Sequence, residues 1–161
     1  MSQAFNLTAT SIAPQKGQYA LLPNLPQEHN VEFYSSTSTD ILPVGAFVKL
    51  YTSSTSTDHP VAQVCAATDV PYGVVVYDAR KAGYAVGERF AVAKTGDVIF
   101  CEAAGAIAVG SKVQFNPTGW KVDDSTTATY AYVGVAITKA IAAGDLVQVK
   151  LDFNLGVQAA G

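Results

Sequence analysis

The feature that most constrains the fold is a series of short strand-like segments that recur about every ten residues from residue 41 onward. Residues 73–77 form a continuous β-branched run, which is typical of a strand buried on both faces. Glycine, asparagine, aspartate and proline separate the segments, as in the four-residue hairpin loop 116–119. The sequence therefore predicts an all-β fold, a β-sandwich or a barrel-like body of about nine short strands. The expected strands are 47–51, 61–65, 73–77, 89–93, 97–101, 111–115, 120–122, 130–138 and 146–151.

The chain also contains an internal echo that keeps its order. Residues 42–50 match 107–115, residues 72–75 match 133–136, and residues 85–92 match 142–149. In each half a glycine precedes a strand, where its tolerance of positive φ suits a tight turn. Either a duplicated β unit or chance matching in a sequence rich in Val, Ala and Gly produces such a pattern. The echo indicates a possible pseudo-repeat that relates residues 42–92 to residues 107–149.

Residues 1–33 differ from the rest of the chain and are predicted to form an extended N-terminal arm. This stretch has three of the seven prolines and few charges, yet apolar residues are spaced through it. Disordered tails are usually rich in charge and poor in such residues, so we expect the arm to pack against another surface. A loose terminus followed by a first edge strand is the alternative. Residues 34–161 are then a single β-rich body, in which the Ser/Thr-rich pieces 35–40 and 53–58 are expected to be solvated loop tips.

Charge and composition exclude several classes of function. The net charge is −3, so the chain has no basic field that would attract nucleic acid. Its apolar runs are far shorter than the roughly 20 residues that span a bilayer, and its N-terminus has no secretory signal pattern. Charged residues are only 14% of the chain, against about 25% in an average domain, which indicates surfaces that are neutral or covered by other subunits. Cys65 and Cys101 lie in apolar stretches and are expected to be buried free thiols, although pairing stays open.

No pattern of catalytic or ligand-binding residues is present. The two histidines, His29 and His59, do not fall in any spacing typical of a nucleophilic site. Spacings typical of zinc, calcium or phosphate sites are absent from the sequence, so no metal and no cofactor is expected. Asp123 and Asp124 are adjacent and point to opposite faces of a strand end, which favours a solvated turn over a carboxylate pair. The sequence does not indicate an enzyme.

Aromatic residues make up 10% of the chain, and the arm adds further apolar side chains. Tyr and Trp are favoured at interfaces because they bury a large rigid ring and keep a polar tip. Most are expected in the core, and a subset is predicted to make subunit contacts. That subset is Phe5, Leu7, Tyr19, Leu21, Leu22, Leu25, Phe33, Tyr51 and Trp120.

Over about residues 41–151 the sequence resembles the small head cement, or capsid decoration, proteins of tailed bacteriophages. Glycine–valine turns and strands carry the resemblance, at residues 43–48, 72–79, 85–92, 108–113, 132–136 and 143–147. It implies a β-rich oligomer on the outer face of the phage head that bridges neighbouring major capsid subunits. The expected partners are the major capsid protein and further copies of this chain, as a homotrimer or, second, a homodimer.

A capsid role agrees with the low charge, because symmetry-repeated weak contacts gain strength by avidity. An extended arm adds a strand to a neighbour's sheet edge with little demand on sequence. The expected location is the virion. The alternative function is a carbohydrate-binding or adhesive β-sandwich module of a phage fibre or bacterial surface, for which surface aromatics and Ser/Thr loops are also suited.

Overall fold

The computed structural model describes residues 13–21, 28–124 and 130–157. Within these ranges the chain forms twelve short strands and no helix, which confirms the predicted all-β class. The strands are β1 (Glu28–Phe33), β2 (Ile41–Pro43), β3 (Phe47–Leu50), β4 (Val61–Val64), β5 (Gly73–Val75), β6 (Gly83–Ala85), β7 (Arg89–Ala93), β8 (Val98–Ala103), β9 (Lys112–Asn116), β10 (Lys121–Asp123), β11 (Tyr132–Ala136) and β12 (Leu146–Leu151).

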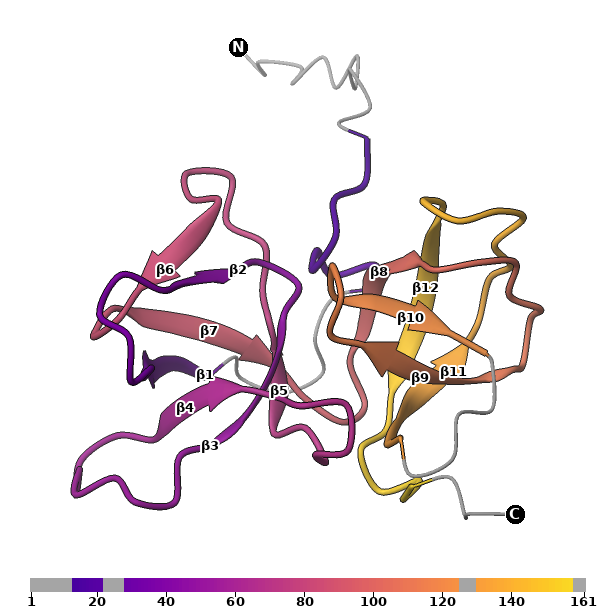
Figure 1. Ribbon diagram of the computed structural model, residues 1–161. Helices are drawn as coiled ribbons and strands as arrows, with labels where there is room; N and C mark the ends of the chain where they lie inside the picture. The colour runs from indigo at the N-terminus through magenta and orange to yellow at the C-terminus, as the bar shows by residue number, and fades with distance from the viewer. Residues whose placement is uncertain (1–12, 22–27, 125–129, 158–161) are drawn as a thin grey trace, which may run out of the picture.

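These strands close into two small five-stranded barrels that lie side by side (Figure 1). Barrel 1 has the strand order β1-β4-β3-β5-β7, and barrel 2 has the order β10-β8-β12-β11-β9. A two-stranded ribbon of β2 and β6 lies at the top of barrel 1 in Figure 1. Closure pairs most strand edges of the described residues with neighbours in the same barrel, which reduces the pairing hazard of a β-rich chain.

The two barrels have the same topology. β1, β4, β3, β5 and β7 of barrel 1 correspond to β8, β10, β9, β11 and β12 of barrel 2, and each barrel has one parallel pair, β1 with β4 or β8 with β10. The strand registers also correspond. Val48↔Gly73, Val75↔Val92, Val31↔Phe90 and Phe33↔Ala62 in barrel 1 match Val113↔Gly134, Ala136↔Val149, Cys101↔Val147 and Ala103↔Val122 in barrel 2.

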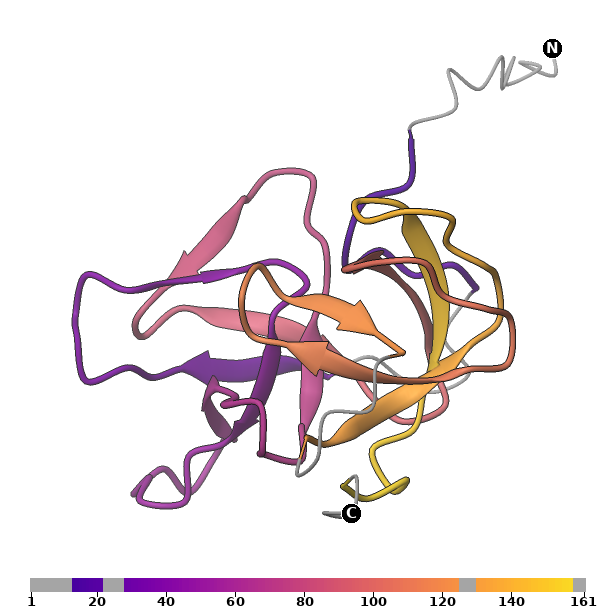
Figure 2. The same cartoon turned by 45° about the vertical axis from the view of Figure 1, so that its right-hand side comes forward.

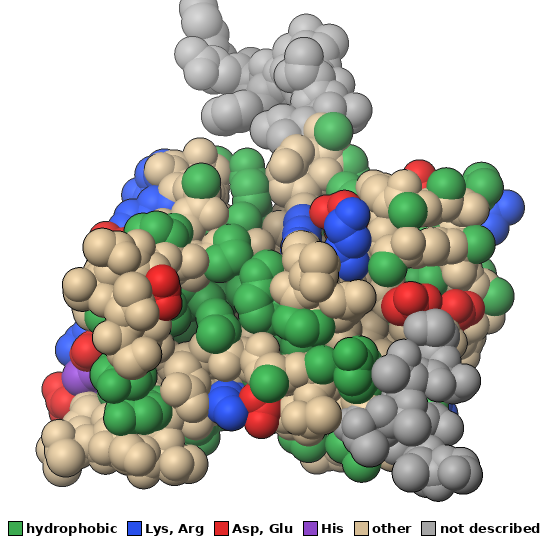
Figure 3. Space-filling model, viewed as in Figure 1, with side chains coloured by type: hydrophobic (Ala, Val, Ile, Leu, Met, Phe, Trp, Pro, Cys, Tyr) green, Lys and Arg blue, Asp and Glu red, His purple; other side chains and the backbone are tan. Residues whose placement is uncertain are grey.

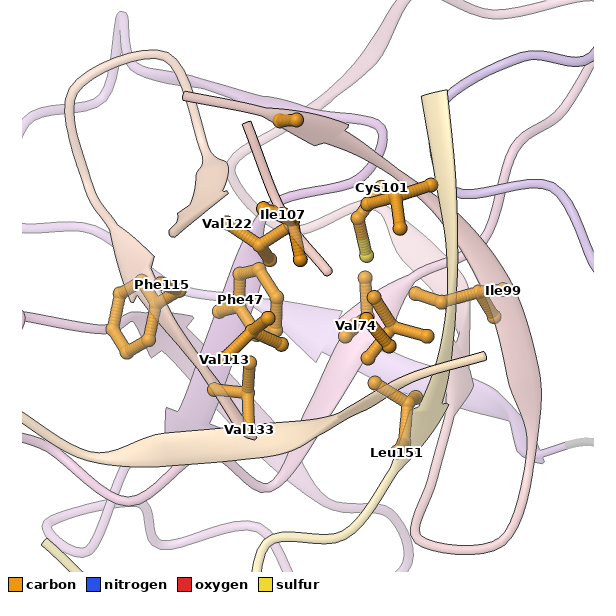
Figure 4. Close-up of a cluster of buried hydrophobic side chains, with 14 of the residues drawn as sticks. Phe47, Val74, Ile99, Cys101, Ile107, Val113, Phe115, Val122, Val133 and Leu151 are labelled. Carbon is orange, nitrogen blue, oxygen red and sulfur yellow. The ribbon is translucent and has the colours of Figure 1, made fainter. Parts of the chain in front are cut away.

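Two hydrophobic clusters fill the molecule. One occupies barrel 1 and includes Val31, Phe33, Val48 and Phe90. The other fills barrel 2 and also takes in side chains from the outer face of barrel 1. Figure 4 shows two of these, Phe47 and Val74, among side chains of the barrel 2 strands. The barrel 2 cluster is therefore shared by both barrels.

Gly73 and Gly134 occupy corresponding positions where two strands approach closely. A Cβ atom at Gly73 would lie 2.9 Å from the carbonyl oxygen of Ala93. A Cβ atom at Gly134 would fall on the carbonyl oxygen of Lys150. The glycines are thus needed for packing, since a strand interior otherwise disfavours glycine.

The nine predicted strands correspond to β3, β4, β5 and β7 through β12, and β1, β2 and β6 were not predicted. β2 ends in Pro43 and β6 begins with Gly83, both of which are turn signals in a sequence. β1 was assigned to the arm, or in the alternative to a first edge strand, because Pro23 and Pro26 precede it closely. Val31 and Phe33 of β1 alternate into the core of barrel 1, with exposed fractions of 0% and 2%. The predicted boundary between arm and body, at residue 33, therefore coincides with the end of β1, which is a strand of barrel 1.

Candidate interaction surfaces

The junction between the barrels is apolar and formed by aromatic rings. Phe47 of β3 stacks on Phe115 of β9, with ring centroids 4.8 Å apart. Trp120 also stacks on Phe115, with centroids 6.4 Å apart, and packs against both hydrophobic clusters. Figure 3 shows hydrophobic side chains gathered along this junction on one face of the molecule. The junction is therefore an internal interface that locks the barrels together.

Trp120 lies in the left-handed region of backbone space, with φ 55°. It follows Gly119, whose φ is 75°, in the β9–β10 hairpin loop that was predicted from residues 116–119. A bulky residue with positive φ is uncommon and costs free energy. The stacked ring and the burial against both barrels offset that cost. Trp120 is half-buried, so part of the indole remains on the surface.

The segment 13–21 lies against barrel 2 as an added strand. The Gly17 N–H donates to the Phe100 carbonyl at 2.8 Å, and the Phe100 N–H donates to the Gln18 carbonyl at 2.9 Å. Tyr19 pairs antiparallel with Ile99, and Figures 1 and 2 both show the segment beside β8. Part of the predicted arm therefore adds a strand to barrel 2 of its own chain.

Lys16 and Gly17 tie this segment to both barrels. A Cβ atom at Gly17 would lie 2.8 Å from the Val75 carbonyl oxygen, so only glycine fits there. The Lys16 stem packs over Gly45 of barrel 1, and its ammonium donates to the Gly119 carbonyl of barrel 2. Burial lowers the pKa of Lys16 because desolvation disfavours its charged form.

The end of barrel 1 that faces away from barrel 2, here called the distal end, consists of the loops 34–40 and 51–60. Figure 1 shows both loops at the left-hand edge of the molecule. Tyr34 and Tyr51 precede the two Ser/Thr-rich pieces, and their rings stack with centroids 4.0 Å apart. An open groove of about 550 Å³ runs past both tyrosines and the hydroxyls of residues 53–57.

His59 holds the distal end together. Its Nε2 lies 2.6 Å from a Glu32 carboxylate oxygen, and its Nδ1 lies 2.7 Å from Asp58. The Ser56 hydroxyl and the His59 ring stabilise the Asp58 carboxylate and lower its pKa. The Ser56 hydroxyl also lies 3.2 Å from Nδ1 of His59, the same nitrogen that faces Asp58. These contacts tie the loop 51–60 to Glu32 of β1.

A second groove, of about 660 Å³, lies along the ribbon side of barrel 1. Both arginines of the chain, Arg80 and Arg89, line it together with Lys81. Arg80 is paired with Asp78 at 3.2 Å, and Lys81 is paired with Glu88 at 2.6 Å. These pairs neutralise Arg80 and Lys81, whereas Arg89 donates to the side-chain oxygen of Asn30.

Among the described residues, the two most exposed large aliphatic side chains lie on two loops of barrel 2, Ile141 at 74% and Val109 at 64%. Ile137, on the same loop as Ile141, is 38% exposed. The loops are joined by the bridge between Ile107 and Ala140. The Asp145 carboxylate accepts backbone N–H bonds within the second loop, which orders it and lowers the pKa of Asp145.

The described residues contain no group of three or more His, Cys, Asp or Glu side chains that could hold a metal ion. Cys65 and Cys101 are free and buried, as predicted, and burial raises the pKa of each thiol to about 12. In the part of the chain that the structure describes, no helix has the length and apolar character required to span a bilayer.

The predicted contact residues fall in different surroundings. Phe33 lies in the core of barrel 1, Tyr51 lies at the distal end, and Trp120 lies at the junction. In the docked segment, Tyr19 is half-buried and Leu21 is 57% exposed. Phe5, Leu7, Leu22 and Leu25 lie outside the described residues.

Sequence reasoning missed the junction residue Phe47, the docking residue Gly17, and the exposed aliphatic loops of barrel 2. Phe47 is the first residue of β3, and the next residue, Val48, faces the interior of barrel 1. The alternation of side chains along a strand therefore places Phe47 on the outer face. An aromatic residue on an outer face was the available signal for a contact between barrels. Gly17 carried no such signal, since close backbone approach by a distant segment is not visible in the sequence.

Comparison with known proteins gives the family. The family model described as XM1 gp53 minor capsid protein matches residues 24–151. The chain belongs to this family. The head fiber gp8.5 N base of bacteriophage phi29, known from a crystal structure, has a similar fold, with a TM-score of 0.51 and 13% sequence identity. The similarity covers 83% of this chain and 95% of that chain. No curated protein matches the chain.

Membership in the minor capsid family confirms the predicted class of protein. The chain is a structural component of a phage capsid and not an enzyme. The expected kind of partner, a capsid protein, follows from the same membership. The matched region includes all twelve strands, so both barrels belong to the family's shared body.

Proposed function

We propose that the protein is a capsid cement, or decoration, protein that binds the outer face of the phage head and bridges neighbouring major capsid subunits. The observation that carries this proposal is the rigid junction of the two barrels, where Phe47 of one stacks on Phe115 of the other. A bridge resists the separation of two capsid subunits only if its two contact surfaces are rigidly joined. Two barrels with a shared core meet that requirement.

The exposed loops of barrel 2 supply a surface suited to the capsid. Val109, Ile137 and Ile141 present aliphatic side chains on loops ordered by backbone bridges, so little entropy is lost when they bind. Exposed apolar side chains gathered on neighbouring loops are typical of protein contacts. The N-terminal residues Phe5 and Leu7 are proposed to add a latch beyond the docked segment.

Self-association is the second part of the proposal, with a homotrimer favoured over a homodimer. Capsid lattices offer local threefold positions, and closed symmetry is the common form of homo-oligomer. Each bound copy then raises the effective concentration of the next, so weak contacts give a stable layer.

The test has two stages. Mass spectrometry of purified particles gives the copy number of this chain against the major capsid protein, and we expect a simple fraction of the capsid subunit number. Purified chain is then added to particles that lack it, using Ile141→Asp and, as a matched control, Ile41→Asp, which changes a side chain of barrel 1 that is 60% exposed. We expect only Ile141→Asp to lose binding. A few copies per particle, or absence from particles, contradicts the cement role.

A carbohydrate-binding or adhesive role is the second candidate, and one observation favours it. The distal groove combines the Tyr34–Tyr51 stack with the hydroxyls of the Ser/Thr-rich loop, which suits stacking and hydrogen bonding to a sugar. Binding of neutral oligosaccharides by the wild type and its loss in Tyr51→Ala, together with unchanged capsid binding, would support this role.

A further inference from the structure

The two barrels use corresponding surfaces in opposite ways. In barrel 1 the outer-face row Phe47–Val74–Ala93 crosses β3, β5 and β7, and all three side chains are buried in the cluster that fills barrel 2. In barrel 2 the corresponding row across β9, β11 and β12 is Lys112–Val135–Lys150. Both lysines are exposed, and Val135 is half-buried between them. One row is covered by a barrel, and its counterpart is left open by the residues that the structure describes.

The barrel ends show the complementary difference. The β9–β10 hairpin of barrel 2 points at barrel 1, whereas the β3–β4 hairpin of barrel 1 points away from barrel 2 (Figure 1). Phe115, which contacts Phe47 at the closed end, has an exposed fraction of 0%. Leu50, at the corresponding position of barrel 1, is 43% exposed. The distal end of barrel 1 thus corresponds to the end of barrel 2 that Phe47 covers, but the described residues leave it exposed.

The charges of the open row and the open end are opposite. The open row presents Lys112 and Lys150. The distal end has three carboxylates, with Asp58 and Glu32 at side-chain exposures of 74% and 34% and Asp40 on the neighbouring loop. The cationic Arg89 and the ionisable His59 lie beside these carboxylates. The carboxylates outnumber the arginine, so the end attracts a lysine row.

We propose that the distal end of barrel 1 docks on the Lys112–Val135–Lys150 row of a second copy of this chain. Within one chain, the end of barrel 2 that contains Phe115 covers the row Phe47–Val74–Ala93 of barrel 1. The proposed contact between two copies has the same arrangement, with the roles of the two barrels exchanged. This contact is the surface through which the self-association proposed above would occur, so it rests on that proposal. Leu50 and Tyr51 pack beside Val135, and Glu32 and Asp58 approach the two lysines.

This contact joins two different surfaces, so it is heterologous, and successive copies form a closed ring when the rotation between them closes. The interface between copies is charged, whereas the interface within the chain is apolar. Copies therefore fold separately and then assemble, and their association weakens as salt screens the lysines and carboxylates.

The first test is the mass of the purified full chain in solution by light scattering after size-exclusion chromatography. We expect an oligomer for the wild type, a shift toward monomer in high salt, and monomers for Lys112→Glu/Lys150→Glu. Lys139→Glu reverses an exposed lysine outside the row and is the control that should keep the wild-type mass. A monomeric wild type, or a double variant with unchanged mass, overturns the proposal.

A mixing experiment tests that the contact is heterologous. Leu50→Lys disables the distal end, and Lys112→Glu/Lys150→Glu disables the row, so each variant alone should be monomeric. An equimolar mixture retains one intact end and one intact row, and we expect it to form a dimer of the two variants. A mixture that stays monomeric overturns the proposal. Because no capsid is present, failure here is distinguishable from failure of capsid binding, which the particle experiment measures.

Discussion

Phe47 and Phe115 stack with their ring centroids 4.8 Å apart and their planes at 22°, although they belong to different barrels. Phe47 lies on the outer face of its own barrel, beside the inward-facing Val48, so its ring is buried only because barrel 2 is present. Phe115 in turn lies in the barrel 2 core, with Phe47 over it. The cluster that fills barrel 2 is therefore incomplete without Phe47 and its neighbours from barrel 1, so we expect the two barrels to unfold as one cooperative unit.

Phe115→Ala should lower the free energy of unfolding of the whole molecule by about 3–5 kcal/mol, as expected for a buried phenylalanine. Chemical denaturation followed by Trp120 fluorescence and by far-ultraviolet circular dichroism measures this, and the two signals should change together. Leu50→Ala, at the corresponding and partly exposed position, is the control and should cost about 1 kcal/mol. Two separate transitions in the wild type would contradict a shared core.

Gly134→Ala should destabilise the molecule by about 3 kcal/mol, because the new methyl group would overlap the backbone carbonyl of Lys150 and force β11 and β12 apart. A backbone atom cannot rotate away as a side chain can. Gly105→Ala is the matched control, since a Cβ atom there meets nothing within 4 Å, and its effect should stay within about 0.5 kcal/mol. Equal thermal midpoints for the two variants would show that β11 and β12 separate easily.

Stability should fall with rising pH above about pH 9, owing to the buried thiols. Burial raises the pKa of Cys65 and Cys101 from 9.0 to about 12, so between these values the unfolded chain releases protons that the folded chain keeps. The folded state then binds more protons, and the free energy of unfolding decreases as pH rises. Burial also raises the pKa of Tyr19 to about 12, which adds to the slope above pH 10.

Cys65→Ala/Cys101→Ala should reduce this alkaline slope, measured as the change in the free energy of unfolding between pH 8 and pH 11 relative to each protein's own value at pH 8. The comparison of slopes removes the cost of the cavities that alanine leaves. A residual slope is expected from Tyr19. A double variant with the full wild-type slope would assign the alkaline loss to other groups.

Local patterns made most of the barrel strands predictable from the sequence. The run 73–77 and the alternating segments gave nine of the twelve strands, because each buries β-branched side chains at a period that is visible in the sequence. Glu28–Phe33 was assigned to the arm, since only Val31 and Phe33 carry its alternation and two prolines precede it closely. The β2–β6 ribbon was missed because β2 ends in proline and β6 begins with glycine, which are turn signals in a sequence.

The interaction surfaces were much less predictable, because they depend on which barrel covers which face. Trp120 was predicted to make a subunit contact, and within the chain its ring stacks on Phe115. Lys112 and Lys150 acquire meaning only when strand register places them opposite Val135, in the row that corresponds to Phe47. Such a relationship needs the pairing of strands that are distant in sequence.

Gly17→Ala should release the segment 13–21 from β8 while leaving both barrels folded. The new methyl group would lie 2.8 Å from the Val75 carbonyl oxygen and 2.9 Å from the Gly45 nitrogen, and the positive φ of 79° adds strain. Hydrogen exchange measures the release through the Phe100 N–H, which donates to the Gln18 carbonyl and should lose protection. The Ala136 N–H, whose acceptor lies within barrel 2, should keep its protection. Leu21→Ala changes an exposed side chain of the same segment and should leave Phe100 protected. If Phe100 exchanges slowly in Gly17→Ala as well, the segment is held by its side chains and not by the close backbone approach at residue 17.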